Sequence, residues 1–128
     1  MKKEFRRTEV SGVKKISKDI CVLELKNIFT EMPQHGQFVM LEPLNKKSSM
    51  PRPFSVAYVH NDSIFVMIKK TGENTSLYSD LKTGDELNIS GPLGKPFAFF
   101  NKHTQQYLLV AGGIGSAALL WIAHGLYV

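Results

Sequence analysis

The sequence predicts a mostly β fold: a six-stranded antiparallel Greek-key barrel with one short helix, followed by the first strand, turn and helix of an α/β domain. Up to about residue 100, short apolar runs are separated by turn residues, which is typical of a small antiparallel barrel. After residue 105, one unbroken apolar run leads into a glycine-rich turn and a helical pattern, which together open a parallel α/β unit. We therefore expect a barrel domain at residues 1–100 and the start of an incomplete second domain at residues 101–128.

The strands of the barrel follow from alternating or β-branched apolar runs. Six such runs predict strands at residues 4–16, 20–25, 36–41, 54–59, 64–68 and 86–89. Residues 60–63 join two of these strands with side chains that favour turns. One helix is expected before the last strand, capped by Asn74 or Thr75 and ending near Leu81, with Gly84 just beyond it.

The apolar tail has two interpretations. Residues 107–111 are typical of a strand buried on both faces, and residues 116–123 are typical of a helix. Alternatively, residues 107–128 form a membrane-spanning helix, because they contain no Asp, Glu, Lys or Arg and about twenty apolar residues can span a bilayer. The three glycines of the turn disfavour such a helix by roughly 1 kcal/mol each. We therefore favour the strand, turn and helix.

Composition limits the chemistry that the chain can carry. Its formal net charge of +5 favours anionic partners, and its hydrophobic content of 43% is that of a globular core. The single cysteine, Cys21, excludes an internal disulfide and a four-cysteine metal site, and its apolar neighbours place it in the core. Four histidines, His35, His60, His103 and His124, lack metal-ligand spacing, so no metal site is expected. No secretory signal is visible, so a cytoplasmic protein without membrane contact is expected.

Two glycine-containing segments have features of phosphate binding. Gly112, Gly113 and Gly115 let the backbone approach a ligand, and the helix that follows directs free N–H groups toward it. Because the pattern is Gly-Gly-Ile-Gly rather than Gly-x-Gly-x-x-Gly, a tight turn without a ligand stays open. The segment from Gly72 to Thr75 begins the short helix, where it can bind a phosphate or only cap the helix.

Arg52, Pro53, Phe54 and Ser55 form the third candidate segment. The guanidinium can bind phosphate oxygens bidentately, the phenyl ring offers a flat face, and the hydroxyl can bond a ligand's edge. These properties suit a flavin nucleotide, although a core phenylalanine beside a surface arginine explains the same residues. Residues 91–94, Gly-Pro-Leu-Gly, are expected to form a rigid turn that leaves the barrel, or a plain linker.

Taken in order, these segments are specific as a set. Arg-Pro-Phe-Ser, Gly-x-x-Thr, Gly-Pro-Leu-Gly and Val-Ala-Gly-Gly-Ile-Gly resemble the ferredoxin-reductase-like flavoproteins, particularly the electron-transfer subunits of bacterial NAD-dependent dihydroorotate dehydrogenases. The resemblance implies that the barrel holds FAD and that the following α/β domain holds NAD(H). It also implies a catalytic dihydroorotate dehydrogenase subunit, or a similar redox protein, as partner. The implied function is electron transfer from dihydroorotate oxidation to NAD in pyrimidine biosynthesis.

The resemblance also implies a set of cofactor-binding residues and no catalytic acid, base or nucleophile. The matching positions are Arg52, Pro53, Phe54, Ser55, Met67, Ile68, Lys69, Gly72, Asn74 and Thr75 for FAD, and Gly112, Gly113 and Gly115 for NAD(H). Asn74 stands where the family often has glycine, and Ala118 where proline is common. The chain ends at Val128, before the rest of an NAD domain and the C-terminal cysteines of a 2Fe–2S cluster. We therefore expect a truncated subunit without an iron–sulfur cluster that is not competent alone.

Other functions stay open at this point. One is another ferredoxin–NAD(P) reductase-like component, and the other is a small basic barrel that binds a ligand without redox activity. Such a barrel could bind single-stranded nucleic acid, but only Phe5 is interleaved among its N-terminal basic residues, so nucleic acid is not expected. A lone strand and helix at residues 107–128 would leave apolar surface and an unpaired edge, which predicts self-association through this segment.

Overall fold

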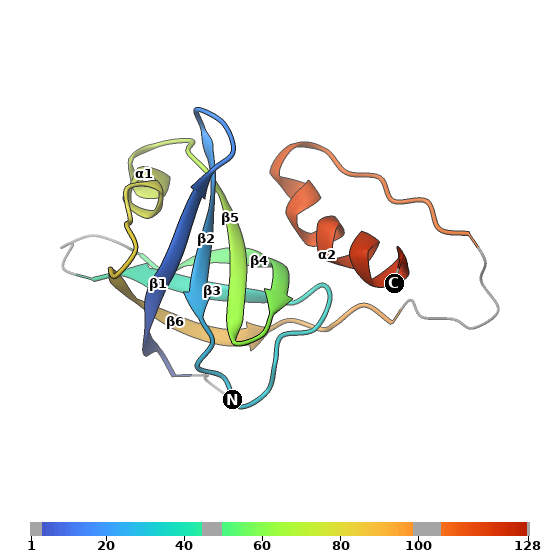
Figure 1. Ribbon diagram of the computed structural model, residues 1–128, viewed down its shortest axis with the longest axis horizontal. Coiled ribbons are helices and arrows are strands. Elements are labelled where there is room, and N and C mark those ends of the chain that lie inside the picture. Colours follow the sequence, from blue (N-terminus) through green and yellow to red (C-terminus); the bar gives the residue numbers. More distant parts are fainter. Residues whose placement is uncertain (1–3, 45–49, 99–105, 128) are drawn as a thin grey trace.

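The computed structural model describes residues 4–44, 50–98 and 106–127, and its main body is a closed barrel (Figure 1). The strands are β1 (Arg6–Lys15), β2 (Ile20–Lys26), β3 (Phe38–Pro43), β4 (Arg52–His60), β5 (Ser63–Lys69) and β6 (Glu86–Leu93). They pair antiparallel in the order β1-β2-β5-β4-β3-β6. Because β3, β4 and β5 are consecutive neighbours and β6 returns beside β3, the connection is a Greek key. The predicted barrel is confirmed.

Alternating burial along the strands explains why the barrel closes on itself. In β5, Ile64, Val66 and Ile68 are fully buried, whereas the residues between them are only partly buried. The same period of two runs along β2, where Cys21 lies in the core as expected. Burial raises the pKa of the Cys21 thiol, and the charge of Lys15 opposes that shift.

The short helix α1 (Glu73–Ser79) lies between β5 and β6 in the chain and begins earlier than expected. Its N-cap is Gly72, whereas the sequence indicated Asn74 or Thr75. The Thr75 hydroxyl accepts a hydrogen bond from the Gly72 N–H at 3.0 Å, so Thr75 caps from inside the first turn. The helix also ends before Leu81, because the Leu81 N–H bonds the Tyr78 carbonyl in a tighter turn.

The expected turn at residues 91–94 is instead the end of β6 followed by a bend. Gly91 lies within the strand, where a Cβ atom would come within 3.2 Å of Val39 Cγ1. A glycine is therefore needed there for close approach of the backbone to β3. The chain leaves the barrel only after Leu93, at Gly94, whose φ of 86° lies in the left-handed region.

The tail contains the predicted turn and helix but not the predicted strand. A single 3-10 turn, η1 (Gly113–Gly115), leads into helix α2 (Ser116–Tyr127). Residues 107–111 are not a strand and do not belong to the barrel sheet. The expectation of a strand there was wrong. Among the residues described, no helix is long and apolar enough to cross a membrane.

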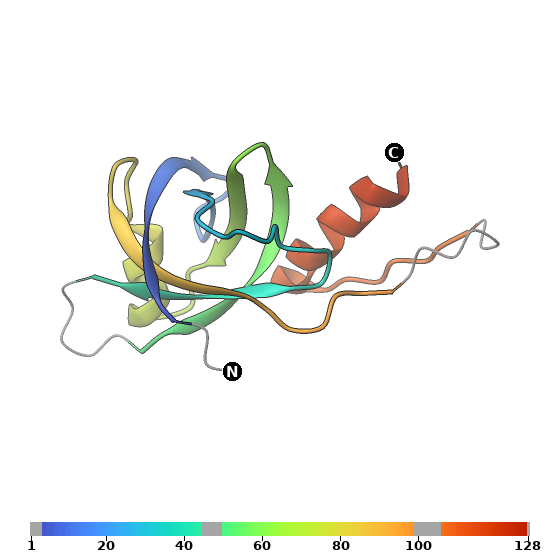
Figure 2. The same cartoon turned by 90° about the horizontal axis from the view of Figure 1, so that it is seen from below.

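Helix α2 packs against the outside of β4, beside the barrel (Figures 1 and 2). Its buried residues are Ala117, Trp121 and Ile122. His35, in the loop before β3, lies against Trp121 with ring centroids 4.2 Å apart. On the other side, Tyr58 of β4 meets His124 edge-on at 5.1 Å. Two histidines therefore lie at the contact between the tail and the barrel.

Acidification is expected to loosen α2 from the barrel. Burial lowers the pKa of His35 and nearby His124 lowers it further, while hydrogen bonding to the Trp121 backbone opposes the shift. The released form therefore binds more protons than the docked form. Docking is then fully stable above about pH 6.5 and weakens as the pH falls through the lowered pKa of His35. The emission maximum of Trp121, the only tryptophan, should shift to longer wavelength in that range.

A matched pair of variants tests whether His35, rather than the exposed His60, causes this pH dependence. His35→Gln should remove most of the pH dependence of the Trp121 emission maximum. His60→Gln should keep it, because His60 stacks on Tyr58 with centroids 6.2 Å apart and is exposed at the end of β4. An unchanged pH profile in His35→Gln would contradict the assignment.

Candidate functional site

Two adjoining cavities lie where β4 begins and α1 starts, and we call them together the β4–α1 cleft. The first has a volume of about 290 Å³ and is lined by Arg52, Pro53, Phe54, Thr71, Gly72, Glu73, Asn74 and Thr75. The second has a volume of about 310 Å³ and is lined by Pro53, Phe54, Ser55, Met67, Lys69, Thr71, Thr75, Ile114, Gly115 and Ala117. They share four residues, so a ligand can extend from one into the other. Each is at the lower end of the size range of small-molecule pockets.

The first four residues of β4 form one wall of the cleft. Pairing with β3 fixes them, with Arg52 opposite Leu41 and Ser55 opposite Phe38. Arg52 and Ser55 are exposed, while the Phe54 ring is half-buried. The wall therefore presents a guanidinium, an aromatic ring and a hydroxyl in sequence along one strand. A rigid strand holds them at fixed spacing, which a flexible loop could not do.

The start of α1 forms the opposite wall of the first cavity. The Thr75 hydroxyl accepts from the Thr71 N–H at 2.7 Å and from the Gly72 N–H at 3.0 Å, and it donates to the Gly72 carbonyl at 3.1 Å. These bonds make helix capping the observed role of the Thr75 side chain. The Ser76 N–H makes the first intrahelical bond, to the Gly72 carbonyl. The N–H groups of residues 73–75 precede that bond and are the donors that a helix start offers to a ligand.

The side chains that line the cleft include two cations and one carboxylate, and this balance favours an anionic ligand. Arg52 lines the first cavity and Lys69 the second, whereas Glu73 is the one carboxylate among the lining residues. The apolar contribution comes from Phe54, Pro53 and Met67, which lie between or beside these charges. The arrangement suits a ligand that has a phosphate and a flat aromatic ring.

The structure brings together most of the residues that the sequence indicated for FAD. Those that line the cleft are Arg52, Pro53, Phe54, Ser55, Met67, Lys69, Gly72, Asn74 and Thr75. Ile68 does not, because side chains alternate along β5 and its own is fully buried in the barrel core. A contact of Ile68 with the ligand could therefore come only from its backbone, and that contact stays a prediction.

Of the three glycines in the tail, only one lines the cleft. Gly115 lines the second cavity, whereas Gly112 and Gly113 line neither cavity and are exposed. The turn therefore touches the cleft through Ile114 and Gly115, and not through its first two glycines. His103 lies outside the described residues, and within the described ranges no three His, Cys, Asp or Glu side chains gather in a way that could hold a metal ion.

Four lining residues were missed by sequence reasoning. Thr71 directly precedes the segment from Gly72 to Thr75, so a segment one residue longer would have included it. Glu73 lies inside that segment but was not among the residues matched to FAD. Ile114 and Ala117 line the second cavity because α2 is docked on β4. No local pattern shows that docking, since it depends on contacts between segments about sixty residues apart.

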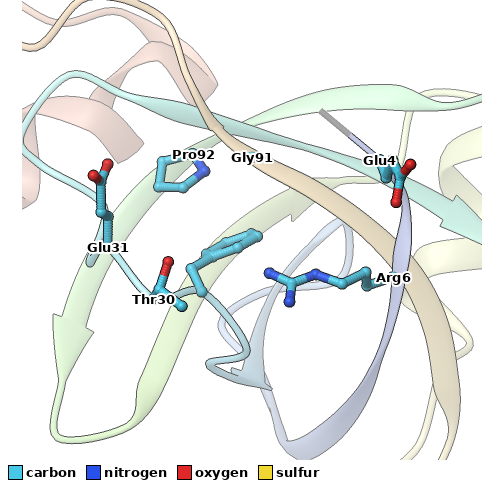
Figure 3. Close-up of a pocket in the computed structure, with 7 residues that line it drawn as sticks. Glu4, Arg6, Thr30, Glu31, Gly91 and Pro92 are labelled. Carbon is cyan, nitrogen blue, oxygen red and sulfur yellow. The ribbon is translucent and has the colours of Figure 1, made fainter. Parts of the chain in front are cut away.

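A further pocket of about 390 Å³ lies on another part of the barrel, between the start of β1, the loop after β2 and the end of β6 (Figure 3). The side chain of Arg6 extends toward Thr30, with Glu4 and Glu31 at the two ends (Figure 3). Its lining includes none of the residues indicated for a cofactor, and it has two carboxylates to one guanidinium. We therefore take the β4–α1 cleft as the candidate site.

Known proteins provide an independent comparison. No family model matches the chain. The electron-transfer subunit of dihydroorotate dehydrogenase B (NAD⁺) from Clostridium acetobutylicum is 31% identical over 126 residues, covering 98% of this chain and 50% of that protein. The corresponding subunit of Caldanaerobacter subterraneus is 36% identical over 91 residues, covering 71% of this chain and 36% of that protein. This chain is a relative of these electron-transfer subunits. It spans half of their length or less.

Solved structures agree with this relationship. An NADH-dependent reduced ferredoxin–NADP oxidoreductase, described for flavin-based electron bifurcation, matches with a TM-score of 0.78 and 28% identity, covering 94% of this chain and 44% of that one. The resemblance to ferredoxin-reductase-like electron-transfer subunits, inferred from the four ordered motifs, is thereby confirmed. The likeness extends through the barrel and into the tail, because the matches cover nearly the whole chain.

Proposed function

We propose that this chain binds FAD in the β4–α1 cleft and serves as an electron-transfer component of an oxidoreductase. The observation that carries the proposal is the convergence of three separate segments, from β4, β5 and α1, on one cleft. These are the segments that the resemblance assigns to FAD. The chain's relatives are named as electron-transfer subunits, and a structural neighbour is described for flavin chemistry.

Each wall of the cleft has a role in this proposal. Arg52 and the first N–H groups of α1 hold the pyrophosphate, while Phe54, Ser55 and Met67 contact the isoalloxazine ring. Lys69 supplies a positive charge beside the second cavity. Bound FAD supplies the redox chemistry, and the protein supplies binding, orientation and electrostatics. Ile114 and Ala117 of the tail add apolar surface to that cavity.

The partner follows from the names of the relatives. We propose a catalytic dihydroorotate dehydrogenase subunit in the cytoplasm, with electrons from dihydroorotate oxidation passing through FAD to NAD in pyrimidine biosynthesis. On this proposal residues 1–100 are the FAD-binding domain, and residues 101–128 are the first part of an NAD-binding domain. Gly112, Gly113 and Gly115 then belong to the turn that approaches the nicotinamide nucleotide.

Flavin binding by the isolated chain is the direct test. Purified protein mixed with FAD and freed of excess cofactor should retain a flavin absorption band at about one FAD per chain. A titration followed by quenching of FAD fluorescence gives the Kd. Absence of both the band and measurable affinity would rule out the proposal. A fluorescent single-stranded oligonucleotide serves as a comparison ligand, and tight binding to it in place of FAD would favour the basic binding module.

The tail is expected to make the chain associate with itself. Leu108 and Val110 are 88% and 80% exposed, and Leu120 of α2 is 51% exposed. Apolar side chains next to an extended backbone without a strand partner favour pairing between chains. Light scattering at tens of micromolar, roughly where such pairing should be seen, is expected to show dimers or larger species. The double variant Leu108→Lys and Val110→Lys should lower the mass, and a wild-type monomer would contradict the prediction.

A further inference from the structure

Tyr78 is the one buried residue of helix α1, although none of the motifs includes it. Its side chain is 1% exposed, and its hydroxyl donates a hydrogen bond to the Leu41 carbonyl of β3 at 2.8 Å. A helix of seven residues has little stability of its own and depends on tertiary anchors. The bond from Tyr78 to Leu41 therefore fixes α1, and with it the first turn that lines the cleft, against the barrel.

The ring of Tyr78 makes a second contact, with the cleft itself. It meets the Phe54 ring edge-on, with centroids 4.9 Å apart and an interplanar angle of 69°. Phe54 lines both cavities of the β4–α1 cleft. Edge-to-face packing of this kind restricts ring orientation and stabilises the pair by about 0.5–1.5 kcal/mol beyond burial. The side chain of Tyr78 thus joins α1 both to β3, through Leu41, and to β4, through Phe54.

The hydroxyl remains a donor across the physiological pH range. Burial, opposed by the charge of Arg52 and supported by that of Glu42, raises the pKa of Tyr78 to about 12. The phenol therefore stays protonated, and its bond to the Leu41 carbonyl is not lost at neutral pH.

We propose that Tyr78 is a positioning residue of the flavin site, which sets the orientation of the Phe54 ring and the spacing between Arg52 and the start of α1. The inference rests on the proposed FAD function and adds to it a residue outside the cleft. Its two contacts have separate consequences. The ring acts on the isoalloxazine through Phe54, and the hydroxyl acts on the first cavity by holding α1 against β3.

Two substitutions separate these consequences. Tyr78→Phe keeps the ring and removes the hydroxyl, so it should raise the Kd for FAD about fivefold, the equivalent of one ordinary hydrogen bond. Because Phe54 stays supported, the visible circular dichroism of bound FAD should match that of the wild type. Tyr78→Leu removes the ring as well, so it should raise the Kd by more than tenfold. It should also change that spectrum, as Phe54→Leu should.

A double-mutant cycle tests whether Tyr78 acts through Phe54. The losses of FAD affinity in Tyr78→Leu and Phe54→Leu should overlap strongly in the double variant, because both remove the same contact. Fully additive losses, or wild-type affinity and spectrum in Tyr78→Leu, would overturn the inference. If Tyr78→Leu does not fold, an unchanged Kd in Tyr78→Phe overturns it instead. Tyr58→Phe is the matched control, since Tyr58 contacts His124 and Phe65, lines neither cavity of the cleft and should leave both readouts unchanged.

The two levels of the proposal fail in different ways. Wild-type protein without a flavin band would remove the FAD function and the role of Tyr78 together. Wild-type protein that binds FAD, with Tyr78 variants that match it in affinity and spectrum, would remove only the role of Tyr78.

Discussion

Replacement of Arg52 by alanine is expected to weaken FAD binding by about 10- to 100-fold, because hydrogen bonds to charged groups contribute about 1.5–3 kcal/mol. Arg52 begins β4, is exposed, and lies on the opposite side of the first cavity from the start of α1. A guanidinium there can bind two oxygens of the pyrophosphate at once. Arg52→Lys keeps the charge but loses the planar fork, so it should recover only part of the affinity.

The control for this prediction is another arginine on the barrel. Arg7 pairs with Glu86 at 3.6 Å on the exposed surface and lines neither part of the cleft, so Arg7→Ala should bind FAD like the wild type. Both variants remove one positive charge, and comparison at two salt concentrations separates specific contact from general attraction. Equal Kd values for Arg52→Ala and the wild type would place the pyrophosphate elsewhere.

Ile68 and Lys69 are adjacent in β5, but their replacement is expected to affect different properties: stability for Ile68 and the reduction potential of bound FAD for Lys69. Ile68 is fully buried in the core, whereas Lys69 is exposed and lines the second cavity. Ile68→Ala should lower the free energy of unfolding by about 2–5 kcal/mol, because it leaves a cavity in a closed barrel. Lys69→Ala should change it by no more than about 0.5 kcal/mol. Urea denaturation of the protein without FAD measures both values.

The flavin readout should show the reverse order. Lys69→Ala is expected to lower the reduction potential of bound FAD, since a nearby cation stabilises the additional negative charge of the reduced flavin. Ile68→Ala, measured well below its unfolding midpoint, should leave the potential close to that of the wild type. A folded Ile68→Ala protein with a shifted potential, and an unshifted Lys69→Ala protein, would exchange the two roles.

The strands of the barrel were predictable because their signals are local. Alternation of apolar residues, as in β2 and β5, states which side chains face inward, and turn residues such as those at 60–63 state where a strand ends. The helix bounds were less predictable, because Thr75 caps from within the first turn and Gly72 supplies the N-cap. Residues 107–111 were misjudged for a related reason. Their apolar run is typical of a buried strand, but a strand forms only where a partner is present.

The residue types of the candidate site and their order along the chain could be predicted from the sequence. The cleft in which they meet could not. Phosphate chemistry at Arg52 and glycine turns at 72 and 115 can be recognised one motif at a time. The alternation that gives β5 its inner face was also present in the sequence, yet matching residues 67–69 as a block included Ile68, whose side chain points into the core. Which residues of a matched block reach a ligand depends on the face of the strand.

Sequence alone determined the chemistry of this protein: the basic balance, the single cysteine, the period of two that makes a barrel, and the ordered motifs shared with its relatives. Tertiary structure alone decided that those motifs meet in one cleft, that α2 adds Ile114 and Ala117 to it, and that Tyr78 joins α1 to Phe54. The physical reason is distance along the chain. Periodicity and turn chemistry act over a few residues, whereas closure of the barrel and docking of two helices depend on the packing of segments tens of residues apart.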